Sequence, residues 1–277
     1  QFNPLEFISK ISNDLKIYEN SFVKKVESNK AFTDKGTVTA QKIIFATHFP
    51  FINRHGSYFL KMYQSTSYAL IFDTHTDLNF EGYYINSEEP VFSFRTVKNG
   101  DKNLLLVVGY DYKTGSEIIG NPFEYLKTKV KNMYPNAEVL KTWTAEDCIS
   151  LDKIPYIGNF SDIMDNCYVA TGFNKWGMTS SMVAAMLLTD AVCGKKNAYA
   201  EVFSPSRTIL RPKLACNAVS AVCNLLTPTA PRCPHLGCAL KWNSAEHSWD
   251  CPCHGSRFDK NGKLLDNPAT GDIKIRP

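Results

Sequence analysis

The chain has 277 residues, of which 44% are hydrophobic and 21% are charged, and its formal net charge is +4. This composition supports a sizeable buried core and excludes a disordered chain, while the small net charge gives no indication of a nucleic-acid partner. No apolar run reaches the roughly 18 residues that a membrane helix needs, and no signal peptide is recognisable, so we expect a cytoplasmic protein without a membrane span.

The first 50 residues predict one helix and two strands. Residues 4–15 place apolar side chains at helical spacing after a proline suited to a helix start. Residues 21–28 and 37–48 have strand character. The apolar run at 43–46 is typical of a central strand that is buried on both faces.

From residue 51 the pattern becomes strand-rich and contains many turn residues, which predicts an antiparallel sheet. Residues 98–103 lie between two apolar runs and indicate a hairpin. Residues 122–134 predict one amphipathic helix, because their apolar side chains form a stripe.

The next part of the chain predicts two further strands, at 137–148 and 166–173, on either side of a turn-rich segment. A long helix is expected from Met178 to a stop at Gly194. Residues 208–226 predict a connecting helix whose start is limited by a proline, and 227–232 predict a linker.

The nine cysteines are an odd number in a chain too large to need disulfides as its main support. Cys148, Cys167 and Cys193 stand singly in apolar surroundings, so we expect them to be buried. Cys216 and Cys223 are seven residues apart in the predicted connecting helix, and we expect both to pack on one face.

Four potential metal ligands stand close together near the C-terminus, as Cys233-x-His235 and Cys251-x-x-His254. Two cysteines and two histidines suit either zinc or a 2Fe–2S cluster with mixed ligation. Each short motif gives one thiolate and one imidazole, as mixed ligation requires, and a glycine near each motif allows a tight turn.

The segments CPHLGC and CPCHGS, together with residues 242–272, resemble the Rieske iron–sulfur family, including the second cysteine of each motif that is typical of the cytochrome-bc type. The resemblance implies a Rieske 2Fe–2S cluster. It assigns one iron to Cys233 and Cys251, the other iron to His235 and His254, and a disulfide to Cys238 and Cys253.

The same resemblance implies how the cluster is tuned. Ser256 stands where high-potential members have a serine bonded to a bridging sulfide. Phe258 stands where those members have a tyrosine bonded to a ligand sulfur, so we expect a lower potential than in respiratory Rieske proteins. His247 is expected to be a surface residue. Rieske domains usually begin with several strands before the first motif, and here only the linker precedes it.

The segment from Cys167 to Val192 reads as a strand, a glycine-containing turn and a helix whose N-terminus suits an anion or a reduced flavin. The segments IIFAT, DKIPYIGNF and VATGFNKWGMT occur in the order found in FAD-dependent oxidoreductases of the D-amino-acid oxidase and glycine oxidase group. The opening QFNPLEFI is also similar to that family. The resemblance runs over residues 1–205, and the whole chain resembles families that fuse such an oxidoreductase to a C-terminal Rieske domain.

This resemblance implies a domain organisation, an FAD cofactor and a set of binding residues. Residues 1–50 and 146–205 are expected to be parts of the FAD-binding domain, 51–145 the substrate domain, 206–232 a helix and linker, and 233–277 the Rieske domain. The residues expected to line the flavin ring are Gly172, Asn174, Lys175, Gly177, Met178 and Thr179, with Val26 near the adenine side. Arg95 is a candidate for holding a substrate carboxylate, or else a solvent-facing arginine. No G-x-G-x-x-G motif for the ADP half of FAD occurs in these residues.

The expected fold class is therefore α+β: part of an FAD-binding α/β domain, an antiparallel substrate sheet and a small all-β Rieske domain. The expected function is oxidation of a small-molecule amine or amino-acid-like donor by FAD, with electrons passing through the cluster to an unknown acceptor. The alternative is an electron carrier or scaffold without flavin catalysis. A Rieske oxygenase would need a mononuclear iron site, and His48, His55, His75 and His247 show no such grouping.

Overall fold

The computed structural model describes residues 3–52, 55–208, 212–228 and 231–275. The chain divides into two compact units, residues 1–43 and residues 44–277, and each is described by itself. Parts of the expected connecting helix (209–211) and of the expected linker (229–230) lie outside the described residues.

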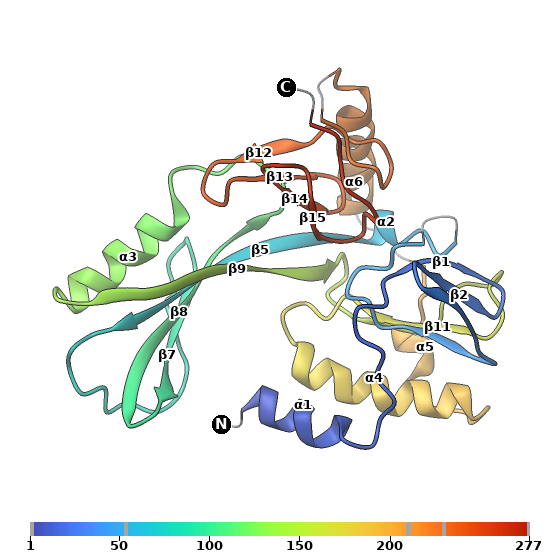
Figure 1. Cartoon of the computed structure of the whole chain (residues 1–277), viewed down its shortest axis with the longest axis horizontal. Helices are drawn as coiled ribbons and strands as arrows, with labels where there is room; N and C mark the ends of the chain where they lie inside the picture. The colour runs from blue at the N-terminus through green and yellow to red at the C-terminus, as the bar shows by residue number, and fades with distance from the viewer. Residues whose placement is uncertain (1–2, 53–54, 209–211, 229–230, 276–277) are drawn as a thin grey trace. The chain divides into compact units, whose positions relative to one another are not determined.

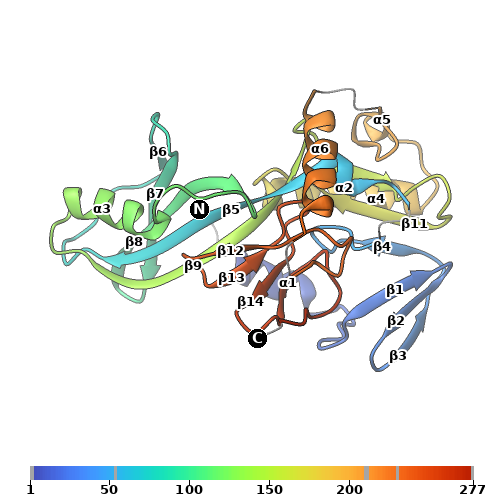
Figure 2. The ribbon, with the colours of Figure 1, turned by 90° about the horizontal axis from the view of Figure 1, so that it is seen from above.

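The first unit consists of one helix and a small antiparallel sheet. Helix α1 (Pro4–Ser12) begins after Asn3, whose side chain accepts a hydrogen bond from the backbone N–H of Leu5 at 3.0 Å. The sheet follows in the order β1 (Val23–Glu27), β2 (Lys30–Thr33) and β3 (Gly36–Thr39), as Figure 2 shows.

The predicted strand at 37–48 is in fact two strands that belong to different sheets. Strand β4 (Ile43–Phe45) follows β3 after a break and pairs only with β11 at the edge of its sheet. Phe45 is buried, but Ile44 is 47% exposed. The prediction of a central strand buried on both faces was wrong, because an edge strand is paired on one side only.

The main sheet of the second unit is antiparallel, in the order β6-β7-β8-β5-β9. Figure 1 shows its long strands β5 and β9 running side by side. The strands are β5 (Met62–Asp73), β6 (Tyr84–Ile85), β7 (Phe92–Asn99), β8 (Lys102–Lys113) and β9 (Glu138–Ser150). The hairpin predicted at 98–103 is confirmed between β7 and β8. Short helix α2 (Tyr58–Lys61) precedes β5, and α3 (Pro122–Met133) packs on this sheet through Leu126 and Val130.

A second, three-stranded sheet, in the order β10-β11-β4, is covered by helix α4. Its bounds are β10 (Tyr156–Asn159), β11 (Cys167–Thr171), α4 (Gly177–Val192) and the short α5 (Ala200–Phe203). Ile157 and Ala170 of the sheet pack against Leu187 and Leu188 of α4. This strand–turn–helix arrangement is the one that the sequence predicted.

The C-terminal module consists of helix α6 and a small antiparallel sheet. Its elements are α6 (Pro212–Leu226), β12 (Lys241–Asn243), β13 (Ser248–Asp250), β14 (Arg257–Asp259) and β15 (Leu264–Asp266). Between α5 and the first cysteine motif, the described residues contain helix α6 but no strand. Across the described ranges, the structure contains no helix both long and apolar enough to cross a membrane.

The five cysteines outside the two motifs divide into buried and exposed groups. Cys148 and Cys167 are buried, as predicted. Cys193, Cys216 and Cys223 are exposed, so the prediction that they pack in the interior was wrong. They lie at the end of α4 and along α6, where only one side of the helix faces the rest of the protein.

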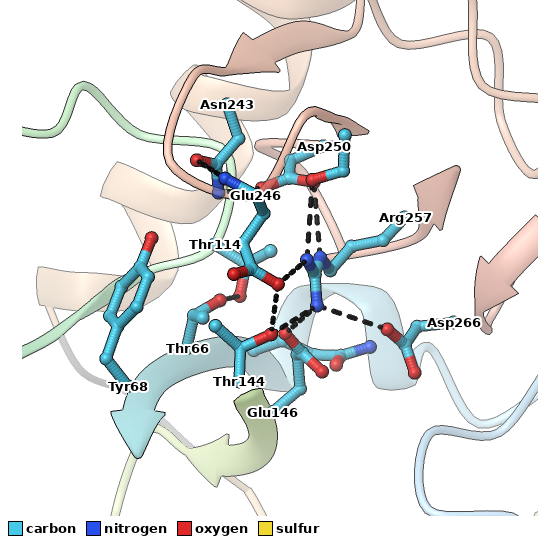
Figure 3. Close-up of polar contacts among 12 residues, drawn as sticks. Thr66, Tyr68, Thr114, Thr144, Glu146, Asn243, Glu246, Asp250, Arg257 and Asp266 are labelled. Atoms are coloured by element: carbon cyan, nitrogen blue, oxygen red, sulfur yellow. Dashed lines mark hydrogen bonds and ion pairs between the residues drawn. The ribbon is translucent and has the colours of Figure 1, made fainter. Parts of the chain in front are cut away.

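The C-terminal module is joined to the main sheet by a buried charge cluster around Arg257, as Figure 3 shows. The guanidinium is 4% exposed and forms ion pairs with four carboxylates, Glu146 of β9 and Glu246, Asp250 and Asp266 of the module. Its Nη1 also donates to the hydroxyl of Thr144 at 3.0 Å. Burial raises the pKa of Glu146 to about 8, and nearby Asp266 adds to this, against the lowering by Arg257.

The raised pKa of Glu146 predicts a pH-dependent stability. The native state holds a proton that the unfolded chain releases near pH 4.5, so this contribution is complete below that pH and is lost as the pH rises through about 8. The free energy of unfolding should fall over this window by up to about 1.4 kcal/mol per pH unit. Urea denaturation at several pH values should show a flatter profile for Glu146→Gln.

Glu88→Gln is the matched control, because Glu88 is an exposed glutamate outside the Arg257 cluster. It should keep the wild-type pH profile. Parallel profiles for the wild type and Glu146→Gln would show that Glu146 is not the titrating group.

Candidate metal centre and cavity

The structure brings the two motifs together as two loops that face each other. The Nδ1 atoms of His235 and His254 lie 3.2 Å apart. The thiols of Cys233 and Cys251 are hydrogen-bonded to each other and buried. The facing loops therefore bring the two imidazoles together and the two thiols together, with one of each contributed by each loop.

The two loops are built in the same way. In the first, the carbonyl of Cys233 accepts from the N–H of Gly237 at 2.8 Å, and in the second the carbonyl of Cys251 accepts from Gly255 at 2.9 Å. Both glycines have a positive φ, 78° and 81°. Other residues rarely adopt this conformation, so the glycines permit the turns that present the ligands.

A disulfide joins the loops. Cys238 and Cys253 are bonded, with their Cα atoms 6.7 Å apart, as the family resemblance implied. Their sulfur atoms lie within 4.8 Å of the thiol sulfur of Cys251. The cross-link therefore holds the loops together directly beside the candidate ligands.

The surroundings shift the pKa values of all four side chains. The pKa of Cys233 is lowered, first by the hydrogen bond with Cys251 and then by backbone N–H groups, whereas the same hydrogen bond and burial raise the pKa of Cys251. Burial lowers the pKa of His235 to about 4 and that of His254 to about 3. Both imidazoles are thus neutral at pH 7 and able to ligate iron.

The Nε2 atom of His254 is buried without a hydrogen-bond partner in the described protein. This atom lies on the other side of the ring from Nδ1, which faces His235. The set itself, two thiols and two neutral imidazoles with their Nδ1 atoms together, fits a mixed-ligand 2Fe–2S cluster. The residues that would hold it are Cys233, His235, Cys251 and His254.

Ser256 and Phe258 lie where tuning residues were expected. The hydroxyl of Ser256 accepts from the N–H of Ala269 at 2.9 Å and is hydrogen-bonded to Cys233. Phe258 is completely buried in the apolar core of the module. Its ring offers no hydrogen bond to a ligand sulfur.

The second ligand loop rests on the main sheet. Gln64 of β5 donates to the backbone carbonyl of His254 at 3.1 Å, and the rings of Phe49 and Phe59 lie 6.3 and 5.7 Å from the His254 ring. The sequence analysis did not identify Gln64 or Arg257. A signal existed for Gln64, because residues 64–67 are four polar residues in succession within an otherwise apolar strand, and all four are buried.

A cavity of about 360 Å³ lies between the end of β9, the loop after β11 and helix α4. Three of the predicted flavin-site residues, Gly172, Asn174 and Gly177, line it. Among the lining residues that were not predicted to bind a ligand are His48, Asp147 and Cys148.

The loop before α4 is fixed by Asn174. Its side-chain oxygen accepts from the backbone N–H of Ser150 at 2.9 Å, and its amide donates to the carbonyl of Gly172 at 2.7 Å. Helix α4 then begins at Gly177 without a side-chain cap from Trp176. Its first N–H groups are therefore available to a ligand at the edge of the cavity.

Lys175 lies in a charged group beside the cavity. Its ammonium is 2.8 Å from a carboxylate oxygen of Asp111 and 3.6 Å from one of Asp147, and it donates to the hydroxyl of Ser67 at 2.6 Å. Two carboxylates therefore surround one ammonium, which leaves no unbalanced positive charge here.

The remaining predicted residues are not among the described residues that line the cavity. Met178 and Thr179 are in the exposed first turn of α4. Arg95 is on β7, with its guanidinium 5.1 Å from the centre of the Tyr83 ring. Val26 is on β1 in the first unit. Their roles toward flavin and substrate stay predictions.

The histidines outside the two motifs do not form a second metal site among the described residues. None of His48, His55, His75 and His247 joins a group of three or more potential ligands there.

Comparisons with family models match two parts of the chain. A model described as FAD dependent oxidoreductase matches residues 10–191, and one described as Rieske [2Fe-2S] domain matches residues 219–277. The chain is 34% identical over 329 aligned positions to YhfW of Bacillus subtilis, named as a Rieske 2Fe-2S iron-sulfur protein, and covers 99% of its own length and 64% of that relative. It is 54% identical over 43 residues to the cytochrome b6-f complex iron-sulfur subunit 1 of Nostoc sp., which is 16% of this chain and 24% of that protein.

Two solved structures share the fold. Glycine oxidase from Geobacillus kaustophilus matches with a TM-score of 0.55 and 19% identity, over 70% of this chain and 54% of that chain. L-proline dehydrogenase from P. horikoshii matches with a TM-score of 0.54 and 19% identity, over 69% and 55%. The chain thus spans 64% of the length of YhfW and about half of the length of the two solved structures.

Replacing His254 by alanine should abolish the cluster, because one iron would lose one of its two imidazoles. We expect iron content and the reduced-state EPR signal to fall to background after reconstitution. The matched control is His247→Ala, which removes an imidazole located between the two motifs but outside the ligand group. An unchanged iron content in His254→Ala would refute the assignment.

Phe258→Tyr should raise the reduction potential of the cluster, because a hydroxyl near a ligand sulfur stabilises the added negative charge of the reduced state. Protein-film voltammetry measures the shift. Phe258→Leu is the control, since it changes packing without adding a donor. A tyrosine variant with the wild-type potential would contradict the role assigned to this position.

Proposed function

Since this chain belongs to the FAD dependent oxidoreductase family and carries a Rieske [2Fe-2S] domain, we propose that it oxidises an amine or amino-acid-like donor and delivers the electrons to the cluster site. One observation carries this proposal. Cys148 lines the cavity and is the cross-strand partner of Gln64, which donates to the carbonyl of His254. A single pair of strands thus connects the cavity with the ligand loop.

The cavity supports a role in holding the flavin ring. When bound, FAD supplies a two-electron acceptor for hydride transfer. Gly172 lets the backbone approach closely, and Asn174 fixes the loop that leads into α4. The uncapped N–H groups at the start of α4 favour negative charge on a bound group.

The charges beside the cavity support an amine as the donor. Asp111 and Asp147 together outnumber Lys175, so this region attracts a cationic group. No positively charged group stands unbalanced among the described lining residues, since burial lowers the pKa of His48 and keeps it neutral. The charges beside the cavity therefore favour the binding of a cationic amine over the binding of a carboxylate.

Gly172 provides a test of the flavin site. A Cβ at this position would lie 3.1 Å from the sulfur of Met62, and its φ is +71°. Gly172→Val should therefore distort the loop and weaken FAD binding by at least about tenfold, which corresponds to about 1.4 kcal/mol. Flavin fluorescence titration of the reconstituted chain measures this.

Gly194→Ala is the matched control, because Gly194 also has a positive φ but lies at the far end of α4 with nothing within 4 Å of its added Cβ. It should bind FAD as the wild type does. A protein that also contains the G-x-G-x-x-G unit missing from these residues, and that takes up the cluster but shows no flavin band near 450 nm, would leave the electron-carrier function in place of the oxidase function.

A further inference from the structure

Gln64 is a buried polar residue that belongs to the main sheet but serves the C-terminal module. It is 2% exposed on β5. Its amide nitrogen donates to two backbone carbonyls of the module, that of the ligand residue His254 at 3.1 Å and that of Asn267 at 2.9 Å. Asn267 in turn donates to the carbonyls of Thr47 and Phe49. The ligand loop is therefore held from the sheet by side-chain amides.

The orientation of the Gln64 amide is fixed by its partners. Both partners are carbonyl oxygens, which only accept, so the nitrogen must face them. The amide oxygen is then buried without a partner in the described protein. Burying an acceptor without a hydrogen-bond partner is unfavourable. A side chain that only filled space could be apolar and would avoid this penalty. The contribution of Gln64 is therefore the two hydrogen bonds that it donates to the module.

The ligand loop approaches Gln64 as closely as a backbone can. A Cβ at Gly255, the residue after His254, would lie 2.5 Å from the Cβ of Gln64. No other residue type fits there without displacing the strand or the loop. The side chain of Gln64 and the missing side chain of Gly255 therefore form a complementary pair.

His254 is also the ligand that contacts residues of the main body of the second unit. Its ring contacts Phe49 and Phe59, and Phe49 follows the cavity-lining His48 in sequence. Gln64 lies opposite Cys148, another lining residue. Gln64, which holds the His254 peptide, is thus the cross-strand neighbour of a residue that lines the cavity.

We propose that Gln64 is a positioning residue that fixes the His254 peptide and raises the reduction potential of a cluster bound by the four ligands. This inference rests on the proposed function, since it requires that cluster. The N–H groups of Gln64 place the positive end of a dipole beside the ligand loop. Such groups stabilise added negative charge and therefore favour the reduced state.

The test is Gln64→Met, which keeps an unbranched side chain of similar length and removes both donors. After cluster reconstitution, we expect wild-type iron content, a lower midpoint potential in voltammetry and a broadened or shifted EPR spectrum of the reduced state. The EPR change follows because the His254 ring loses its fixed orientation.

Thr144→Val is the matched control at the same interface. It removes the hydrogen bonds of Thr144 with Arg257 and Glu246 but does not touch the ligand loop. It should lower the melting temperature without moving the midpoint potential or the EPR spectrum. A shift of the same size in both variants would mean that the potential follows general loosening, and this would overturn the role of Gln64.

The remaining outcomes are distinguishable. A wild-type chain with a Rieske EPR signal, and a Gln64→Met variant with the same potential and spectrum, would overturn the positioning role alone. A wild-type chain that assembles no cluster would overturn the ligand assignment, and the role of Gln64 with it.

Discussion

The ligand loop can reach the main sheet only because two glycines leave room for it. Gly255 lies within the loop, and its missing side chain is replaced by the side chain of Gln64. Gly115 follows β8 on the sheet side, and a Cβ there would lie 2.5 Å from the backbone nitrogen of Pro252. Both glycines have a positive φ, 81° and 73°. The segment from Cys251 to Gly255 thus packs closely against the sheet at two places, at Gly255 beside Gln64 and at Pro252 beside Gly115. This close packing brings His254 into contact with the sheet.

The interface around this loop is polar, which makes it specific. Arg257 meets Glu146 and Thr144 across it, and Gln64 meets two carbonyls. Polar groups lose water when they are buried, so they tolerate only arrangements in which each finds its partner. An apolar interface of the same size would permit the module to slide or rotate. The polar contacts therefore specify one placement of the candidate cluster ligands on the sheet.

The four ligands could be predicted from the sequence because each loop encodes its own turn, thiol and imidazole within a few residues. The partners of Gln64 and Arg257 could not be predicted, because they lie far along the chain: His254 is 190 residues from Gln64, and Glu146 is 111 residues from Arg257. The edge strand β4, with its exposed Ile44, and the exposed cysteines of α6 were mispredicted for a related reason. An apolar pattern shows that a side chain can be buried, but only the tertiary arrangement decides which elements cover it.

The alternation of side chains along β5 and β9 explains how one pair of strands can serve two sites. Gln64 and Glu146 point to the module, while Ser67 and Asp147 contact Lys175 beside the cavity. Successive residues of a strand face opposite sides, so the contacts of the module and of Lys175 arise from neighbouring positions on the same strands. A shift of one residue in the β5–β9 register would bring Asp147 under Arg257 and move Glu146 to the side of Lys175. The register that pairs Gln64 with Cys148 and Thr66 with Glu146 is therefore a requirement shared by the cavity and the ligand loop.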